Sequence, residues 1–266
     1  MLDRYNRNIN YLRISVTDRC NLRCVYCMPR EGVDWVPHSE ILSYDEIIEV
    51  VKTAVSMGVN KVRLTGGEPL VRKGIIYLVE RIARIDGVND FGMTTNGILL
   101  DQFALPLREA GLHRLNISLD TMDPDEFRSI TRNGNLRDVL HGIKAALDAG
   151  FNSIKINCVI KESPEEENAR QVARFCHENN LEVRFILQMN LEDGHFHKVI
   201  GGSGGDCTGC NRLRLTSTGN IIPCLFSDLS FNIKEYGIKE ALELAVSNKP
   251  ASGSCSHVNT FNTLGG

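Results

Sequence analysis

The stretch Cys20-Asn21-Leu22-Arg23-Cys24-Val25-Tyr26-Cys27 places three cysteines in the spacing C-x3-C-x2-C, directly after an apolar strand pattern. A four-iron, four-sulfur cluster usually takes one thiolate per iron. Three cysteines without an adjacent fourth therefore predict a cluster with one iron open to another ligand. An open coordination position is typical of a reactive metal site. A structural zinc loop and a metal-free group of buried cysteines are the alternatives at this point.

The composition is typical of a soluble globular protein, with 266 residues of which 42% are hydrophobic and 24% charged. This length fits one α/β barrel with an appendage. The formal net charge of -3 argues against nucleic-acid binding. Neither a signal peptide nor an apolar run long enough to span a bilayer is present, which predicts a cytoplasmic protein without a membrane partner. Nine cysteines in such a chain favour metal or redox chemistry over disulfides.

Strand and helix patterns alternate along most of the chain. Strands are expected at 12–16, 61–65, 90–94, 114–119, 153–159 and 181–187. Helices are expected from Ser43 to Gly58, at about 74–85, at 101–110, from Asp123 to Ala149 in two parts, and after a cap at Ser163. This alternation predicts a parallel sheet. Because no dinucleotide glycine fingerprint follows the first strand, we expect an α/β fold of the partial (β/α)6 TIM-like barrel type.

The alternation ends at Met189, which divides the chain into 1–189, a linker-like segment 190–206 and a C-terminal region 207–266. The segment contains Gly201-Gly202-Ser203-Gly204-Gly205, a composition typical of flexible linkers, natural or engineered. The C-terminal region predicts a β-hairpin at 212–216 and 221–226, followed by a short helix near 234–246.

Polar or glycine-rich sequences follow five of the predicted strands, at the edge where α/β barrels bind ligands. They are the cysteine loop, Thr65-Gly66-Gly67-Glu68-Pro69, Thr94-Thr95-Asn96-Gly97, Ser118-Leu119-Asp120 and Gln188-Met189. An ordinary turn explains any single one, but five at one edge predict a ligand site. Gly66 and Gly67 would let the backbone approach a ligand, and a zwitterionic amino acid is one candidate.

Four cations lie between apolar neighbours in the middle of predicted strands, namely Arg13, Arg63, Lys155 and Arg184. A cation on a covered face of a sheet is costly unless it is paired. A structural ion pair explains any single one. Because four of the six strands share the feature, we expect these side chains to converge on a polyanion such as a phosphate ester.

A second group of cysteines, Cys207, Cys210 and Cys224, has the spacing C-x2-C-x13-C. It fits either a structural zinc site completed by Cys255 or His257, or a second cluster with an open iron. Arg212 and Arg214 alternate in the strand that follows the first two of these cysteines, so both would point toward whatever that iron holds.

Together these motifs resemble the radical S-adenosylmethionine enzymes. The strings from Asn10 to Pro29, Thr94 to Gly97, Asn116 to Asp120 and Cys207 to Phe226 resemble, among them, the GTP 3′,8-cyclases of molybdenum-cofactor biosynthesis. The resemblance implies two [4Fe-4S] clusters, a first on Cys20, Cys24 and Cys27 that binds S-adenosylmethionine, and a second on Cys207, Cys210 and Cys224 that holds the guanine of GTP.

The resemblance also implies which other residues form the site. Contacts with S-adenosylmethionine fall on Tyr26, Gly66, Gly67, Glu68, Ser118 and Met189. Contacts with GTP fall on Arg13, Arg63, Thr94, Lys155, Arg184, Arg212 and Arg214. The terminal Gly265 and Gly266 would reach into the active site, where only residues without side chains fit.

The implied reaction is that of a lyase. Reductive cleavage of S-adenosylmethionine gives methionine and a 5′-deoxyadenosyl radical, which removes hydrogen from C3′ of GTP; attack on C8 then closes the ring to 3′,8-cyclo-7,8-dihydro-GTP. The implied partners are GTP, an electron donor such as a flavodoxin-like protein or a chemical reductant, and the next enzyme of the cofactor pathway. The resemblance leaves open whether the protein forms a homodimer.

In two places the chain departs from the pattern of these cyclases. They usually carry several dozen more residues where this chain has 201–205, and Leu187 stands where they commonly have Glu. One hypothesis is therefore a shortened or engineered relative that keeps both clusters but has changed substrate. The alternatives are a radical S-adenosylmethionine enzyme acting on another nucleotide or a peptide, and a catalytically inactive iron–sulfur or zinc scaffold.

Overall fold

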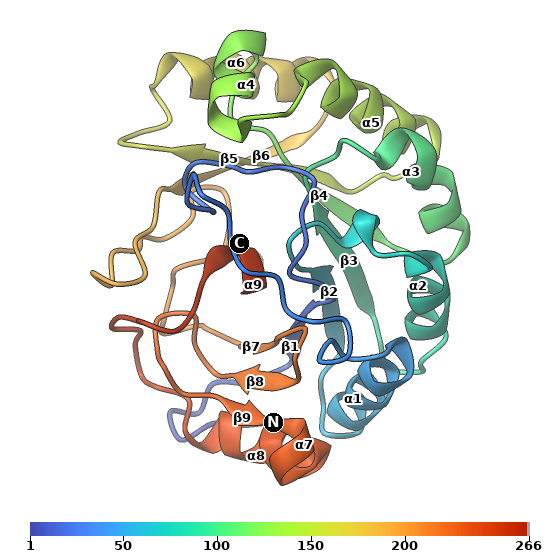
Figure 1. The fold of residues 1–266 in the computed structure, drawn as a ribbon, viewed down its shortest axis with the longest axis vertical. Coiled ribbons are helices and arrows are strands. Elements are labelled where there is room, and N and C mark those ends of the chain that lie inside the picture. The colour runs from blue at the N-terminus through green and yellow to red at the C-terminus, as the bar shows by residue number, and fades with distance from the viewer. Residues whose placement is uncertain (265–266) are drawn as a thin grey trace.

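Six parallel strands form the larger part of a curved sheet in the computed structural model, which describes residues 1–264. They are β1 (Tyr11–Ser15), β2 (Lys61–Thr65), β3 (Asp90–Thr95), β4 (Arg114–Ser118), β5 (Ile154–Ile160) and β6 (Glu182–Leu187), and each pairs with the next. The helices between them cover the outer face of the sheet (Figure 1). They are α1 (Tyr44–Ser56), the 3-10 turn η1 (Pro69–Val71), α2 (Ile75–Ala83), α3 (Leu100–Glu109), α4 (Pro124–Thr131), α5 (Leu136–Asp148) and α6 (Glu167–Glu178). The predicted partial barrel is thus confirmed.

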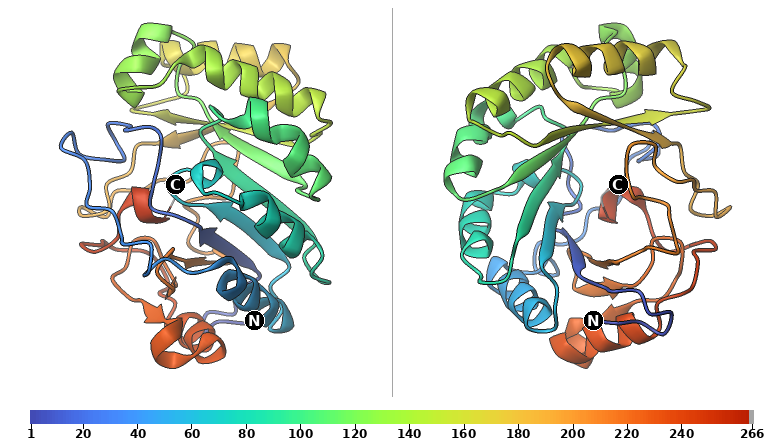
Figure 2. Two further views of the ribbon diagram at one scale, coloured as in Figure 1. Left: turned by 45° about the vertical axis from the view of Figure 1, so that its right-hand side comes forward. Right: turned by 180° about the vertical axis from the view of Figure 1, so that it is seen from behind.

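The C-terminal region continues the same sheet. Strand β7 (Arg212–Leu215) runs parallel to β1, and β8 (Asn220–Ile222) and β9 (Phe231–Asn232) follow antiparallel, so the predicted hairpin is confirmed. The predicted single helix is divided at Gly237, whose φ of 79° separates α7 (Ile233–Tyr236) from α8 (Ile238–Ser247). The short helix α9 (Phe261–Leu264) lies within the opening of the curved sheet in all three views (Figures 1 and 2).

The hydrophobic core lies between the outer face of the sheet and the helices. Side chains alternate between the two faces of a strand, and those of Leu12, Leu64, Met93 and Ile117 on the outer face are fully buried. Parallel strands covered on both sides usually read as continuous apolar runs. Here the inner positions of the same strands carry charged and polar residues, which sets the inner face apart as the place for a polar ligand.

Two predicted helix starts have different outcomes. Ser43 caps α1, and its side chain and that of Glu46 form the expected capping box. The cap predicted at Ser163 is wrong, because α6 begins at Glu167 without a side-chain cap. Ser163 instead forms a turn, in which its hydroxyl accepts from the amide of Glu165 at 3.2 Å.

The glycine run at 201–205 forms a closed turn beside β6. The amide of Val199 donates to the carbonyl of Gly204 at 2.8 Å, and Phe185 and Ile200 exchange backbone hydrogen bonds of 3.0 Å. Gly205 has a φ of 73°, and a Cβ there would lie 1.9 Å from the carbonyl oxygen of His197. Glycine is therefore required at this position by the packing of the turn.

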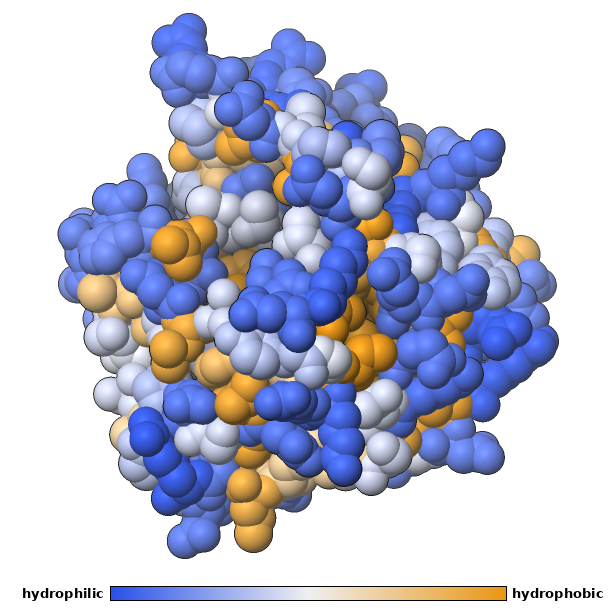
Figure 3. Space-filling model, turned by 60° about the horizontal axis from the view of Figure 1, so that its bottom comes forward, coloured by the Kyte–Doolittle hydropathy of each residue, from blue (hydrophilic) through white to orange (hydrophobic). Residues whose placement is uncertain are grey.

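The surface shown in Figure 3 is mostly hydrophilic, with hydrophobic residues exposed in small groups between hydrophilic ones. Within residues 1–264, the helices are all too short or too polar to cross a membrane.

Candidate active site

A cavity of about 170 Å³ lies at the carboxyl ends of the parallel strands. It brings together predicted residues from distant parts of the chain, namely Cys20, Cys24, Tyr26, Cys27, Gly66, Gly67, Thr94, Ser118 and Met189. Asn157, Val159, Leu187 and Phe261 complete its wall from β5, β6 and α9. The polar strand ends therefore meet at one site, which we name the first cavity.

The cysteine loop is fastened to the sheet and to the end of α4. The amide of Val25 donates to the carbonyl of Ile130 at 2.9 Å. The hydroxyl of Tyr26 donates to Oδ2 of Asp120 at 2.7 Å, while Oδ1 accepts from the amide of Val159 at 2.8 Å. Asp120 thus links the cysteine loop to β5. Burial raises the pKa of the Asp120 carboxyl to about 6, although the hydrogen bonds from Val159 and Tyr26 oppose the change.

The chemistry of the donor set in the first cavity fits an iron–sulfur cluster. Three thiols from one loop face a common cavity, as a cluster with one open iron requires. Burial raises the pKa of Cys24 and Cys27 to about 12, and it also raises that of Cys20. Metal binding needs thiolates, so these thiols lose their protons as iron binds.

Gly66 and Gly67 are required by the packing of two loops. The amide of Gly67 donates to the carbonyl of Thr17 at 2.7 Å. A Cβ on Gly66 would lie 2.5 Å from that same oxygen, and one on Gly67 would lie 2.2 Å from the carbonyl oxygen of Arg19. The backbone after β2 therefore touches the backbone that leads into the cysteine loop. This contact gives a structural reason for the glycines beside the predicted ligand contact.

Glu68 lies behind the wall of the first cavity and does not line it. Its side chain is buried and accepts hydrogen bonds from the amide of Leu70 at 3.0 Å, the hydroxyl of Thr95 at 2.8 Å and the amide of Asn96 at 2.7 Å. Burial raises the pKa of Glu68 to about 7. Glu68, which is predicted as a cofactor contact, thus links the loops that follow β2 and β3 through its hydrogen bonds.

A row of arginines crosses the inner face of the sheet. Arg13 is in register with Arg214 on β7 and with Arg63 on β2, and the row continues through Gly92 to Arg114 on β4. Arg63 is 4% exposed, and its Nε donates to the hydroxyl of Tyr11 at 2.6 Å. The strand register thus confirms that the cations of β1 and β2 share one face.

Several of these guanidinium groups have spare hydrogen-bond donors. Buried nitrogens without a hydrogen-bond partner among residues 1–264 include Nη1 of Arg63 and Nε of Arg184 and Arg212. In the same part of the chain, none of these three forms an ion pair with a carboxylate. Buried donors are normally satisfied. The inner face therefore suits a ligand rich in anionic oxygens.

Lys155 and Arg114 differ from these because each has a carboxylate partner. Lys155 pairs with Glu182, and Arg114 pairs with Asp90. For the predicted cations we considered either a structural ion pair or a bound polyanion. Lys155 has the structural ion pair. Arg114 was not predicted, since it begins its strand instead of interrupting an apolar run.

Tyr11 lies among the cations and was also missed. Its ring centroid is 5.0 Å from Nζ of Lys61 and 5.8 Å from Cζ of Arg212. Burial alone would raise the pKa of the Tyr11 phenol, but Arg63, Arg13 and the other cations outweigh it and lower the value to about 8. The signal for this residue was its spacing of two from Arg13, which places both on one face.

A second cavity of about 80 Å³ contains the other cysteine group. Its lining includes Cys207, Cys210, Cys224, Arg212, Arg214, Lys249 and Met189. Met189 also lines the first cavity, so the two sites share a wall. Within residues 1–264 no three His, Cys, Asp or Glu side chains are grouped around the place of a single metal ion. The thiolates of a four-iron cluster each bind a separate iron, so they do not need to meet at one ion.

The electrostatics of the second cavity differ from those of the first. Burial would raise the pKa of Cys210, but Lys249 and Arg212 outweigh it and the pKa is lowered. Burial raises the pKa of Cys224. The two residues considered as a fourth zinc ligand do not line this cavity; Cys255 instead has its sulfur 3.9 Å from Nε2 of His257. Three thiols beside buried cations fit a cluster with an open iron.

The predicted Gly265 and Gly266 lie outside the described residues. The helix that precedes them, α9, contributes Phe261 to the first cavity. Its Leu264 packs with Leu191, Ile222 and Phe226.

Comparison with known proteins agrees with this geometry. Residues 14–176 match the family model of the radical SAM superfamily. The structure of SuiB from Streptococcus suis bound to S-adenosylmethionine has a TM-score of 0.67 at 16% identity, over 92% of this chain and 65% of that longer one. A structure of native anSMEcpe with bound AdoMet has a TM-score of 0.63 at 17% identity, over 90% and 81% of the two chains. The chain is thus a radical SAM protein by sequence and by fold.

Curated relatives show to which family within the radical SAM superfamily the chain belongs. The GTP 3′,8-cyclase of Thermodesulfovibrio yellowstonii is 39% identical over the full length of both chains. That of Desulforamulus reducens is 42% identical over 88% of this chain and 86% of its own. The chain belongs to the GTP 3′,8-cyclase family of radical SAM enzymes. The first alignment runs over 323 positions, more than the 266 residues of this chain, so that relative carries segments that are absent here.

The first prediction concerns Gly67→Ala. The added Cβ would force apart the backbones at Gly67 and Arg19, so we expect a loss of stability of about 1–3 kcal/mol and loss of about four irons per chain after reconstitution. Chemical denaturation of the metal-free protein and iron analysis measure the two effects. Gly209→Ala is the control for stability, because a Cβ there meets nothing within 4 Å. A Gly67→Ala protein that binds as much iron as the native protein would contradict the prediction.

The second prediction concerns Asp120→Asn in the metal-free protein. The pKa of Asp120 is about 6 in the folded state, above the ordinary 3.8. Its contribution to stability is therefore complete below pH 3.8 and is lost as the pH rises through 6. The free energy of unfolding of the variant relative to the native protein should rise by up to about 3 kcal/mol over this range. Urea denaturation at a series of pH values measures it, and parallel profiles would refute the assignment.

Proposed function

We propose that the protein is a radical S-adenosylmethionine GTP 3′,8-cyclase that converts GTP to 3′,8-cyclo-7,8-dihydro-GTP in molybdenum-cofactor biosynthesis. The observation that carries the proposal is the contact between two three-cysteine cavities through Met189, beside a face of buried arginines. Membership of the cyclase family supports the same reaction.

The first cavity is the site of the radical source. Cys20, Cys24 and Cys27 would hold a [4Fe-4S] cluster whose open iron binds S-adenosylmethionine. When bound and reduced, this pair supplies the 5′-deoxyadenosyl radical that removes hydrogen from C3′ of GTP. Tyr26, Gly66, Gly67 and Ser118 line the cavity around it, and the chain's part is to hold the reacting groups in place and exclude water.

The inner face of the sheet is the site of the triphosphate. Arg63, Arg184 and Arg212 have buried donors to spare, and a triphosphate offers many anionic acceptors. Arginine remains charged at neutral pH, so these groups would hold the triphosphate without a change of protonation. Arg13, Arg214, Thr94 and Lys155 complete the proposed GTP site.

The second cavity is the site of the guanine. Cys207, Cys210 and Cys224 would hold a second [4Fe-4S] cluster with an open iron, and Arg212 and Arg214 line the same cavity. Since Met189 belongs to both walls, a nucleotide reaching from the second cavity would present its ribose to the first. An external reductant, protein or chemical, delivers the electron, and the next enzyme of the cofactor pathway receives the product.

A second candidate is a related reaction on another nucleotide. It is favoured by Leu187, an apolar residue in the wall of the first cavity, and by the segments of the relatives that this chain lacks. The arginine row suits any nucleoside triphosphate, so only the base would differ.

The third prediction is the test of the proposed function. Anaerobic reconstitution should give about eight irons per chain, and addition of reductant, S-adenosylmethionine and GTP should give 5′-deoxyadenosine and the cyclised nucleotide, measured by chromatography. ATP, CTP and UTP serve as parallel substrates. 5′-Deoxyadenosine that does not rise with GTP refutes the cyclase, and a rise with another nucleotide alone selects the second candidate.

The fourth prediction concerns Arg212→Ala. Loss of a charge-assisted hydrogen bond to phosphate should weaken GTP binding by about 10- to 100-fold while S-adenosylmethionine binding stays unchanged. Equilibrium binding of each ligand to the reconstituted protein measures this. Arg84→Ala, on an exposed arginine that pairs with Glu80, is the control. Equal losses for both ligands in Arg212→Ala would contradict the assignment of two sites.

A further inference from the structure

Lys249 is a buried lysine that the proposed reaction does not use. It follows α8 and is 1% exposed. Its ammonium donates to the carbonyl of Arg212 at 2.8 Å and to the carbonyl of Pro223. Arg212 stands two residues after Cys210, and Pro223 directly precedes Cys224. One side chain therefore ties together the two segments that carry these cysteines.

Lys249 also faces the sulfur atoms. It lines the second cavity together with the three cysteines, and its positive charge lowers the pKa of Cys210. No carboxylate in the described part of the chain forms an ion pair with it. Burying an ammonium without a counter-charge is unfavourable. The groups that can balance it are therefore the cysteines.

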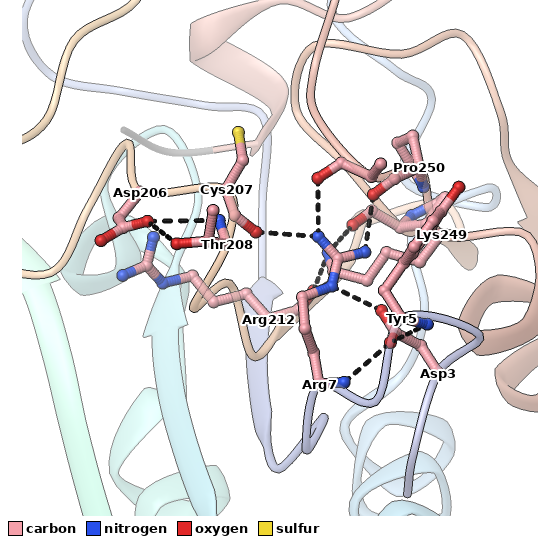
Figure 4. Close-up of polar contacts among 11 residues, drawn as sticks. Asp3, Tyr5, Arg7, Asp206, Cys207, Thr208, Arg212, Lys249 and Pro250 are labelled. Carbon is pink, nitrogen blue, oxygen red and sulfur yellow. Dashed lines mark hydrogen bonds and ion pairs between the residues drawn. The ribbon is translucent and has the colours of Figure 1, made fainter.

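Arg7 is the instructive contrast, because it contacts the carbonyl of Cys207 and not its sulfur (Figure 4). Its guanidinium donates to the carbonyls of Cys207 at 2.8 Å and Pro250 at 2.6 Å. Asp3 pairs with it at 2.6 Å, so its charge is balanced locally. Arg7 does not line the second cavity. The two cations thus have similar anchoring roles but different electrostatic ones.

We propose that Lys249 is a positioning residue of the second cluster that also balances its charge: it fixes the Cys210 and Cys224 segments and places one uncompensated positive charge beside the sulfurs. This inference rests on the second cluster of the proposed function. A [4Fe-4S] core of charge 2+ with three thiolates is negative overall and becomes more negative on reduction. A buried cation beside it favours the reduced form and raises the reduction potential.

The fifth prediction compares Lys249→Met, Lys249→Arg and Arg7→Met in the reconstituted full-length protein. Iron content and a redox titration followed by electron paramagnetic resonance are measured. The signal that changes when S-adenosylmethionine is added identifies the first cluster, which serves as the internal reference. In Lys249→Met the second cluster should shift to a more negative potential while the first stays unchanged. Because it keeps the positive charge, Lys249→Arg should keep the potential of the second cluster close to the native value.

Arg7→Met separates charge from anchoring. It should lower the unfolding temperature of the metal-free protein, as Lys249→Met does, but leave the potential of the second cluster unchanged. If Lys249→Met cannot hold the second cluster but Lys249→Arg can, the result supports a need for positive charge at this position. If both variants lose the second cluster, the proposed charge balance is overturned. An unchanged potential in Lys249→Met also overturns it. A native protein with only about four irons would instead refute the second cluster itself, and with it the proposed function.

Discussion

Repulsion among the arginines on the inner face of the sheet is the constraint to which the rest of the structure responds. Arg214, Arg13 and Arg63 lie side by side on strands that are about 4.8 Å apart, where like charges are destabilising. Gly92 separates Arg63 from Arg114, and a Cβ there would lie 3.1 Å from Cγ of Arg114 and 3.5 Å from Nη2 of Arg63. The outer face compensates, because it buries a continuous apolar layer against the helices. The fold is therefore stabilised by the packing of its outer face, while the inner face stays cationic and suits the proposed anionic ligand.

The sequence was sufficient for the parallel strands because each outer face leaves a local apolar pattern, and the predicted bounds agree with the structure to within a residue or two. It was insufficient where the decisive partner is distant. The pairing of β7 with β1 joins Arg212 to Tyr11 across about two hundred residues, and no local pattern records it. At Ser163 a turn and a helix cap have the same local signature, and the turn formed.

The same division applies to the site. The cysteines and the glycines at 66–67 were predicted because their spacing is local. Tyr11 and Lys249 were missed because their roles come from neighbours on other strands and loops; Lys249 bonds to carbonyls 26 and 37 residues away. The hydrogen bonds of the Glu68 side chain to the loops after β2 and β3 could not be predicted, since a motif does not show which side of its loop a carboxylate faces.

The two cysteine sites are built on different physical principles. The first depends on backbone touching backbone at Gly67 and Arg19, so its shape is set by sterics and tolerates changes of charge better than an added methyl group. The second is held by side chains, with Lys249 and Arg7 bonded to carbonyls beside its cysteines, so its shape and its charge are linked. A site that must accept a cofactor at a fixed iron gains from rigid backbone. In the proposed function the second site must attract an anionic nucleotide and gains from buried cations, which would also set the charge of the proposed second cluster.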